Sequence, residues 1–308
     1  MNRIIDYLAY HVNSSKARDI DPQNEAIMYL CDRFELNMEQ RCWLCFLYST
    51  NYCVPTTYFM YNEFPDFATV DVSRLDRWWR ANREKLIFQT DKRWIRSRNL
   101  FVRVFCSYRD LIHSYSHGTM SQYDALTALL RPNADPAENY GLLCTEFNIY
   151  YFGRFGYFLY SELLHNVCGI NVGVRFDIRE AESSRNGLVI ALGLEREAWT
   201  GHSGRALSEA EAAKLNQGLQ YIADLIARLD IEPRHKSFWS IETTLCAYRK
   251  YKEKQSRWVG YYIERMRREI VKMEQATDKE HGGVCWRPLW EFRRETYQPK
   301  YLKELCKE

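Results

Sequence analysis

Apolar residues recur at intervals of three and four along most of the chain, which is the spacing of an amphipathic helix. Polar start signals divide this pattern into segments. Asn37 with Gln40 and Ser208 with Glu211 have capping-box spacing, and Asp21 precedes a proline suited to a first helical turn. These signals predict helices over residues 22–35, 37–48, 99–115, 154–167, 208–229, 237–254 and 256–275. We therefore predict a mainly α-helical fold.

Alternating apolar and polar positions, typical of a strand, occur only at Val172–Ile178 and Leu188–Leu192. Clusters of Gly, Asn and Ser predict a turn over Cys168–Gly173 and a loop over Ser183–Gly187. Strand patterns are therefore scarce beside the helical ones.

Gly201-His-Ser-Gly204 has the composition of a flexible connection. It predicts a boundary between a helical lobe of residues 1–200 and a C-terminal helical lobe of residues 205–308. The two lobes are expected to pack into one shared core.

The composition is that of a globular chain, because 46% of its 308 residues are apolar and 27% are charged. Disordered and fibrous proteins are thereby excluded. No apolar run approaches the roughly 18–20 residues that a membrane span requires, and Asp6 interrupts the first apolar run too early for an export signal. We expect no membrane partner and a cytoplasmic location.

Ten cysteines are too few for a disulfide scaffold in a chain of this length. Cys42-Trp-Leu-Cys45 has the spacing of a metal-binding pair, but no second pair follows it, and the seven histidines form no matching cluster. Core packing is the favoured interpretation of this pair, and no resident metal is expected.

Positive charge and aromatic rings coincide in two windows. Residues 74–109 contain eleven Lys or Arg against three Asp or Glu, interleaved with Trp78, Trp79 and Trp94. Residues 249–269 contain eight against three, again with Tyr and Trp between them. Such windows attract phosphate backbones, and aromatic faces stack on unpaired bases. Solvated helix faces with buried rings explain the same pattern, so both interpretations stay open.

Several familiar catalytic motifs are absent. The sequence contains no GxxxxGK[ST], GxGxxG, GxSxG or HExxH. A P-loop kinase is therefore not expected, and catalysis would rest on Arg, Lys, Glu and Tyr side chains, with a bound divalent ion as a further option.

Three segments, taken in order, resemble one family. They are Thr90-Asp-Lys-Arg-Trp-Ile-Arg96, the Gly-Arg-Phe…Glu-Leu-Leu pattern of Phe152–His165, and the Glu-Thr-x-Leu-Cys-x-Tyr…Gly-Tyr-Tyr-x-x-Arg pattern of Ile241–Arg265. The chain is similar in these segments to the α-glutamyl/putrescinyl-thymine pyrophosphorylases of bacteriophages, also called amino acid:DNA transferases. The similarity extends from about residue 39 to residue 295.

The resemblance implies a helical protein distantly related to the helix–hairpin–helix DNA glycosylases, acting in the infected bacterial host. It implies transfer of an amino acid or polyamine to double-stranded DNA that carries pyrophosphorylated 5-hydroxymethyluracil, with release of pyrophosphate. One departure concerns the glycosylase hairpin, because Gly169-Ile-Asn-Val-Gly173 lacks its proline and Asp177 follows after only four residues. Base excision is therefore not expected.

The implied reaction expels pyrophosphate, so cations must neutralise the charge that grows on the leaving oxygen. Lys92, Arg93, Arg96 and Arg265 are the candidates for phosphate binding, and Arg154 is a candidate catalytic cation. A Mg²⁺ ion would assist, although no cage of carboxylates is visible in the sequence.

The attacking amine must lose a proton. Glu162 and Glu242 lie in apolar helical segments, where burial raises a carboxyl pKa toward that of a useful general base, and His165 is a second choice. The target base must also leave the duplex to be reached. The candidates to stack on it are Tyr150, Tyr151, Tyr248 and Tyr261.

Structural roles explain the same residue types. Arg154 and Glu162 lie about two helical turns apart and could belong to an ion network, and an acid such as Glu242 is favoured near a helix N-terminus. Tyrosines commonly pack in a core. Two other functions also stay open: a helical DNA-recognition partner of a 5-hydroxymethyluracil DNA kinase, and a non-catalytic helical DNA-binding protein.

Overall fold

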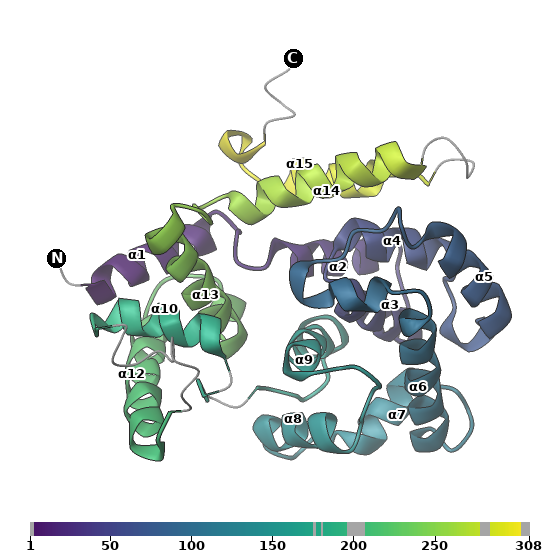
Figure 1. The fold of residues 1–308 in the computed structure, drawn as a ribbon, viewed down its shortest axis with the longest axis horizontal. Coiled ribbons are helices and arrows are strands. Elements are labelled where there is room, and N and C mark those ends of the chain that lie inside the picture. The colour runs from purple at the N-terminus through teal and green to yellow at the C-terminus, as the bar shows by residue number, and fades with distance from the viewer. Residues whose placement is uncertain (1–2, 175–176, 180, 196–206, 278–283, 303–308) are drawn as a thin grey trace. The chain divides into compact units, whose positions relative to one another are not determined.

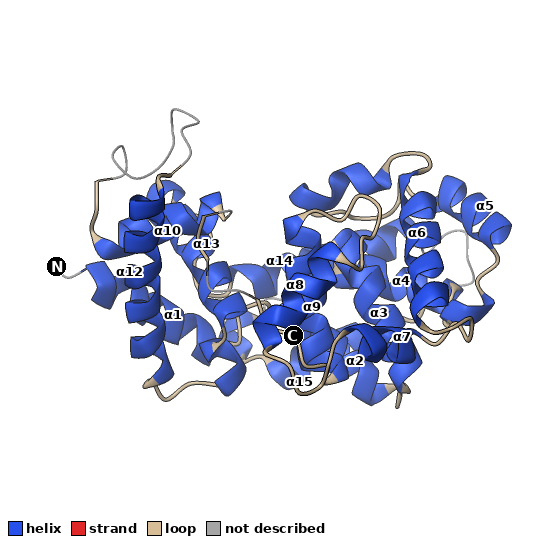
Figure 2. Ribbon diagram, turned by 90° about the horizontal axis from the view of Figure 1, so that it is seen from below, coloured by secondary structure: helices blue, strands red, loops and turns tan. Residues whose placement is uncertain are grey.

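The computed structural model describes residues 3–174, 177–179, 181–195, 207–277 and 284–302. The described residues form helices joined by turns and loops, with no strand among them, which confirms the predicted mainly helical fold (Figures 1 and 2). Within these ranges, no helix is both long enough and apolar enough to cross a bilayer.

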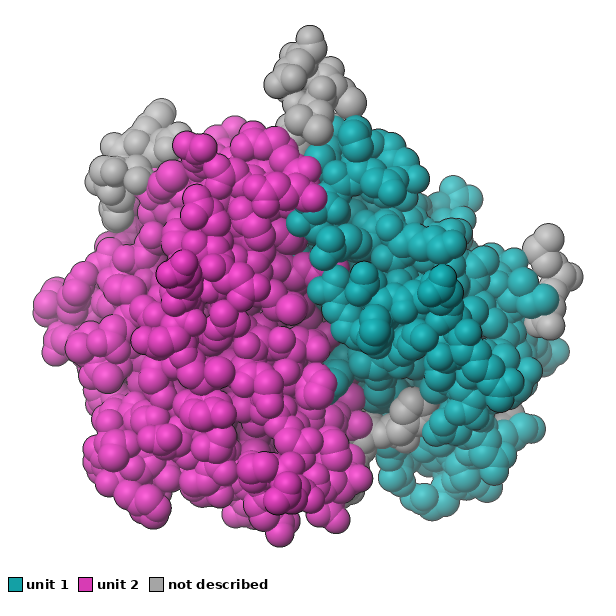
Figure 3. Space-filling model, turned by 180° about the vertical axis from the view of Figure 1, so that it is seen from behind, with its two compact units in different colours: residues 1–22, 175–265, 296–308 teal, residues 23–174, 266–295 magenta. Residues whose placement is uncertain are grey.

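The chain divides into two compact units, coloured separately in Figure 3. Unit 1 consists of residues 1–22, 175–265 and 296–308, and unit 2 of residues 23–174 and 266–295. Each unit is therefore built from separate stretches of the sequence. The segment 201–204, predicted to contain a lobe boundary, lies outside the described residues.

Unit 2 contains most of the helices. They are α2 (Pro22–Arg33), α3 (Met38–Asn51), α4 (Val54–Glu63), α5 (Val72–Asn82), α6 (Leu100–Tyr115), α7 (Gln122–Leu129), α8 (Pro136–Thr145), α9 (Arg154–Cys168), most of α14 (Tyr261–Thr277) and of α15 (Arg287–Thr296), and the 3-10 helices η1 (Phe67–Thr69) and η2 (Thr90–Arg96).

Helix α3 is central to unit 2, because every residue from Cys42 to Asn51 is buried. It packs mainly against α9, and also against α4, α7 and η2 (Figure 1). Phe46 of α3 stacks on Tyr108 of α6 with ring centroids 3.8 Å apart, and the hydroxyls of Tyr108 and Tyr160 lie 3.0 Å from each other. The aromatic richness of the sequence is therefore used largely in this core.

Unit 1 is built around α10 (Glu182–Leu192) and α13 (Phe238–Lys254), together with α1 (Arg3–Lys16) and α12 (Glu209–Ala227). It also includes the 3-10 helices η3 (Pro233–Lys236) and η4 (Pro299–Tyr301). Its apolar core draws on all four α-helices, with Tyr7, Leu188, Leu215 and Leu245 among the buried members.

Local start signals behave as predicted. Asn37 and Gln40 exchange two backbone–side-chain hydrogen bonds of 3.0 Å, and Ser208 and Glu211 form the second capping box. A tertiary cap begins α14, because the Asp19 carboxylate accepts hydrogen bonds from the backbone amides of Gly260 at 2.7 Å and Ile263 at 2.9 Å.

The loop predicted at Ser183–Gly187 is wrong, and the candidate strand at Leu188–Leu192 is not formed, since both segments belong to α10. The Gly residue there serves helix packing rather than a turn. A Cβ atom on Gly187 would lie 2.0 Å from the backbone oxygen of Leu245, so α10 and α13 cross at a distance that only glycine permits. In Val172–Ile178, the described residues are irregular.

Candidate functional site

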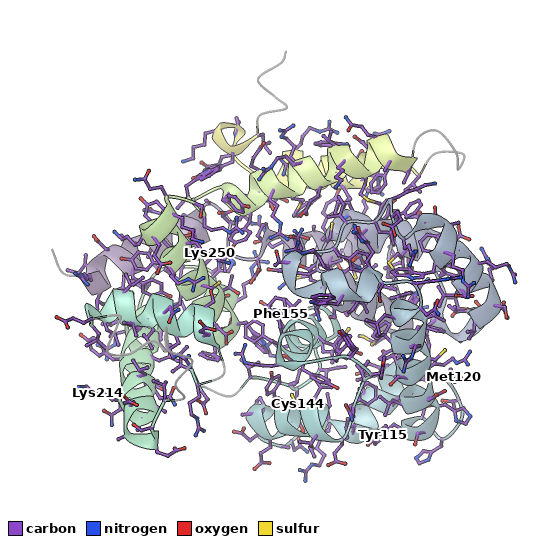
Figure 4. All side chains as sticks on the ribbon, viewed as in Figure 1. Tyr115, Met120, Cys144, Phe155, Lys214 and Lys250 are labelled. Atoms are coloured by element: carbon purple, nitrogen blue, oxygen red, sulfur yellow. The ribbon has the colours of Figure 1, made fainter. Side chains whose placement is uncertain are left out.

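A small cavity of about 100 Å³ lies in unit 2 where η2 meets the start of α9, and we call it the Lys92 pocket. Lys92 is only 4% exposed. Its ammonium lies 4.7 Å from the ring centroid of Phe152 and 5.8 Å from that of Phe155, which is labelled in Figure 4. These aromatic faces stabilise a desolvated cation. The pocket is lined by Lys92, Trp94, Ile95, Tyr151, Gly153, Phe155 and Gly156.

Two glycines shape the side of the pocket formed by α9. A Cβ atom on Gly156 would lie 3.0 Å from Lys92 Nζ, so this glycine leaves the space that the ammonium occupies. Gly153 is the N-cap residue of α9, and no side-chain hydrogen bond caps the start of this helix. The pocket thus combines a buried ammonium with the positive end of a 15-residue helix, and both attract anions such as phosphate.

Exposed aromatic rings border the same pocket. The side chain of Trp94 is 71% exposed and that of Tyr151 is 54% exposed, whereas Trp78 and Trp79 of the same basic window are buried. Tyr151 has a φ of 65°, a conformation uncommon for a non-glycine residue. Exposed rings beside a cation are typical of surfaces that stack on bases.

Other predicted residues of unit 2 lie on the same two elements. Arg93 is exposed and Arg96 is half-buried on η2. Arg154 is the first residue of α9, and its guanidinium lies 5.5 Å from the ring centroid of Phe158, one turn further along the helix. Glu162 is buried about two turns further along α9, and His165 is exposed near its end. The structure therefore unites Lys92 and Tyr151 in one pocket and places Arg93, Arg96 and Arg154 on the elements that form it.

Apart from Tyr150, the remaining predicted residues belong to unit 1. Glu242 is buried on α13, and Tyr248 of the same helix is 1% exposed, with its ring centroid 5.3 Å from that of Tyr7. Tyr261 is half-buried, and the guanidinium of Arg257 lies 3.9 Å from its ring centroid. Arg265 of α14 lies 5.9 Å from the ring of Tyr262. Tyr248 is thus enclosed by the core, whereas Tyr261 belongs to an arginine–tyrosine stack.

The structure also shows a hollow that the sequence did not single out. It has a volume of about 540 Å³ and lies along one face of α6, where Arg103, Ser107 and Asp110 contribute to its wall together with Tyr150. Residues spaced by four and three share one helix face. The sequence placed Arg103 in a basic window and offered Tyr150 for stacking, but this helical spacing is indistinguishable from an ordinary solvated face, so nothing in the sequence grouped these residues into one site.

The Cys42 and Cys45 side chains of α3 pack against a third cysteine. Cys168, at the end of α9, has its sulfur 3.7 Å from that of Cys42 and 3.8 Å from that of Cys45, and all three are buried. Among the residues that the structure describes, no group of three or more His, Cys, Asp or Glu is arranged to hold a metal ion. The three thiols therefore pack with one another inside unit 2.

Comparison with known proteins shows the family of this helical chain. A family model described as amino acid:DNA transferase matches residues 15–255, and the chain belongs to this family. The resemblance to these transferases is thereby confirmed.

A named relative gives a second comparison. The chain is 26% identical over 275 residues to a protein named serinyltransferase from Salmonella phage ViI, an alignment that covers 82% of this chain and 64% of that protein. The chain thus spans less than two thirds of its relative's length. No solved structure matches the chain.

Proposed function

We propose that the protein is a transferase that attaches an amino acid to a modified thymine base in phage DNA, in the cytoplasm of the infected bacterium. The observation that carries this proposal is the Lys92 pocket in a member of the amino acid:DNA transferase family. A buried ammonium, a helix N-terminus and two exposed rings are what a phosphorylated nucleotide requires of a binding site.

The proposed acceptor is 5-(pyrophosphoryloxymethyl)uracil in double-stranded DNA. The lone pair of the amine nitrogen forms a bond to the exocyclic methylene carbon, and the bond from that carbon to oxygen breaks. The electron pair leaves with pyrophosphate, and the nitrogen gives up its surplus proton to a base. Lys92 and the start of α9 would neutralise the charge on the leaving group, with Arg93, Arg96 and Arg154 close along the chain.

Proton removal falls to a carboxylate first, and to an imidazole second, in this proposal. Glu162 is the first candidate because it is buried on α9, the helix whose N-terminus borders the pocket. Glu242 of unit 1 is the second, and His165 is a further choice. A buried carboxylate is a stronger base than an exposed one, because burial disfavours its charged form.

Base recognition would use the exposed rings. The target base has to be flipped out of the duplex, at a cost of a few kcal/mol that stacking offsets. Trp94 and Tyr151 border the pocket and offer accessible faces. In unit 1, Tyr261 and the phosphate-binding candidate Arg265 are proposed to contact DNA, whereas Tyr248 is 1% exposed and presents no face on which a base could stack.

The test supplies the protein with duplex DNA containing 5-(pyrophosphoryloxymethyl)deoxyuridine, together with single amines. Serine comes first because of the relative's name, followed by other amino acids and putrescine. We expect a new nucleoside by mass spectrometry and equimolar pyrophosphate, with Lys92→Met slowing both about tenfold or more. Lys214→Met is the control, since Lys214 lies on α12 of unit 1 (Figure 4).

Other outcomes would contradict the proposal. Unchanged DNA with every amine, from protein that binds the duplex, would favour the non-catalytic DNA-binding alternative. Stimulation of a 5-hydroxymethyluracil DNA kinase in the absence of transfer would favour the DNA-recognition partner.

A further inference from the structure

The hollow along α6, which we call the Arg103 hollow, carries a cation and an anion on one helix face. Arg103 and Asp110 lie two turns apart, and Ser107 lies between them. Seven residues of helix separate their Cα atoms by about 10.5 Å. No ion pair joins either residue to a side chain that the structure describes, so both charges face the hollow with hydrogen-bonding capacity to spare.

Contacts from the loop before α9 hold this arrangement in place. The backbone amide of Tyr150 donates a 2.9 Å hydrogen bond to Ser107 Oγ, which fixes the loop against α6. The Arg103 guanidinium lies 4.3 Å from the ring centroid of Tyr150. An arginine stacked on an aromatic ring keeps its planar donors free for an anion, and its side chain loses less freedom on binding.

We propose that the Arg103 hollow binds the free amino acid consumed in the reaction, with the substrate's carboxylate on Arg103 and its amino group on Asp110. This assignment rests on the proposed function, because it names the site of the second substrate. A carboxylate accepts a hydrogen bond from an ammonium or from a neutral amine, so Asp110 holds the nitrogen before and after it loses its proton. Asn148 adds a polar group to the wall.

The dimensions suit a zwitterion. A carboxylate oxygen and the amino nitrogen of an amino acid lie roughly 3 Å apart. With a hydrogen bond of about 2.9 Å at each end, the substrate bridges a guanidinium and a carboxylate separated by roughly 9 Å. A spacing of about 10.5 Å between the Cα atoms of Arg103 and Asp110 is compatible with that separation.

The same charges select against a polyamine. Putrescine carries two ammonium groups, and one of them would face Arg103. Of the two donor classes that the sequence leaves open, the hollow therefore takes the amino acid.

The position of the hollow also fits the reaction. Tyr150 lines the Arg103 hollow and Tyr151 lines the Lys92 pocket, and their ring centroids are 6.0 Å apart. An amino acid in the hollow would thus lie beside the site proposed for the leaving pyrophosphate, which is where a nucleophile must be held.

The kinetic test uses Arg103→Met and Asp110→Asn with the transfer assay described above. We expect each variant to raise KM for the transferred amino acid about 10- to 150-fold, the loss typical of a charged hydrogen bond, and to leave KM for the DNA within twofold. Arg109→Met is the matched control, because Arg109 lies on α6 over the Phe105 ring and does not line the hollow. Unchanged KM for the amino acid in both variants would overturn the site and leave the proposed transfer intact.

A binding test separates failure of the site from failure of the proposed function. Saturation-transfer NMR on protein without DNA, using L-serine, the other protein amino acids and putrescine, detects binding even when no transfer occurs. Binding of an amino acid that is lost in Arg103→Met supports the site; binding of putrescine alone, or of an amino acid equally by wild type and both variants, rejects it. If the wild type transfers nothing, the proposed function fails, and this binding result alone decides the site.

Discussion

The ammonium of Lys92 lies 3.0 Å from the point that a Cβ atom on Gly156 would occupy. The ammonium of a lysine in η2 thus occupies the space beside a glycine of α9 that a side chain would need, although 64 positions separate the two residues in the sequence. The second glycine of the Phe152-Gly-Arg-Phe-Gly156 motif consequently has a specific role, because it allows a buried cation to lie against the first turn of a helix.

Gly156→Ala is expected to displace the Lys92 ammonium and lower kcat/KM for DNA transfer about tenfold or more. The reason is geometric, since a misplacement of about 1 Å in a positioned catalytic group can cost up to two orders of magnitude in rate. Steady-state transfer kinetics and thermal unfolding of the variant are the measurements.

Gly173→Ala is the matched control for this substitution. Its Cβ atom would also make a 3.0 Å contact in unit 2, but with Pro136 and away from the pocket. It should therefore retain activity, and thermal unfolding measures whether its loss of stability matches that of Gly156→Ala, whose Cβ atom would also meet two Phe152 ring atoms at 3.0 Å. Equal loss of activity in both variants would attribute the effect of Gly156→Ala to general destabilisation.

Trp94→Ala is expected to weaken binding to duplex DNA carrying the modified base by about 5- to 150-fold in Kd. Stacking of one base on an aromatic ring contributes roughly 1–3 kcal/mol, and Trp94 is the more exposed of the two rings bordering the pocket. Fluorescence anisotropy measures Kd, and Tyr221→Ala on α12 serves as a control, because Tyr221 is also more than half exposed. A Kd unchanged by Trp94→Ala would remove this ring from the proposed interface.

The sequence predicted local features of the fold well, because these depend on neighbouring residues. The capping boxes at Asn37 and Ser208 are formed, and the helical periodicity of the chain is confirmed. The error at Gly187 has a tertiary cause: Asn-Gly is typical of turns, but here the missing side chain allows α10 to approach α13. A local pattern contains no information about a partner helix more than fifty residues away.

The candidate site could be predicted only in part for the same reason. Charge and motif singled out Lys92 and Tyr151, which the structure brings into one pocket. Arg103 and Asp110 look like any solvated helix face, and Cys168 is 123 residues from Cys45, so neither grouping had a sequence signal. The proposed relationship to DNA glycosylases stays a prediction, since no solved structure matches the chain.

The stability of the protein is expected to fall as the pH drops below 6.5, because unit 1 buries two neutral histidines. His11 donates from Nε2 to the backbone oxygen of His235 at 2.9 Å, and its Nδ1 lies 2.8 Å from the Thr244 hydroxyl. Burial lowers the pKa of His11 to about 4, and burial together with nearby positive charge lowers the pKa of His235 to about 3. The unfolded chain therefore binds protons below pH 6.5 that the folded protein does not, and protonation favours unfolding.

Between pH 6.5 and 5, each histidine should cost about 2 kcal/mol of unfolding free energy, at roughly 1.4 kcal/mol per pH unit. Burial raises the pKa of Asp19 to about 7, so the folded protein takes up a proton there and offsets the effect of about one histidine, which leaves a net loss of stability. Urea unfolding at pH 7, 6 and 5 measures the slope. His11→Asn should flatten it, whereas His113→Ala should not, because His113 is exposed. A free energy of unfolding that is constant over this range would contradict the burial of neutral imidazoles in unit 1.

Gly187→Ala tests the crossing of α10 and α13, on which the core of unit 1 depends. The added Cβ atom would lie 2.0 Å from the backbone oxygen of Leu245, and a backbone atom cannot move aside without separating the helices. We expect a loss of about 1–3 kcal/mol in the free energy of unfolding, the usual cost of overpacking, measured by urea denaturation. Gly218→Ala of α12 is the control, because its Cβ atom would meet only the end of the flexible Leu192 side chain, 2.5 Å away, and alanine favours the helix. Equal stability of the two variants would mean that α10 and α13 do not approach as closely as this packing requires.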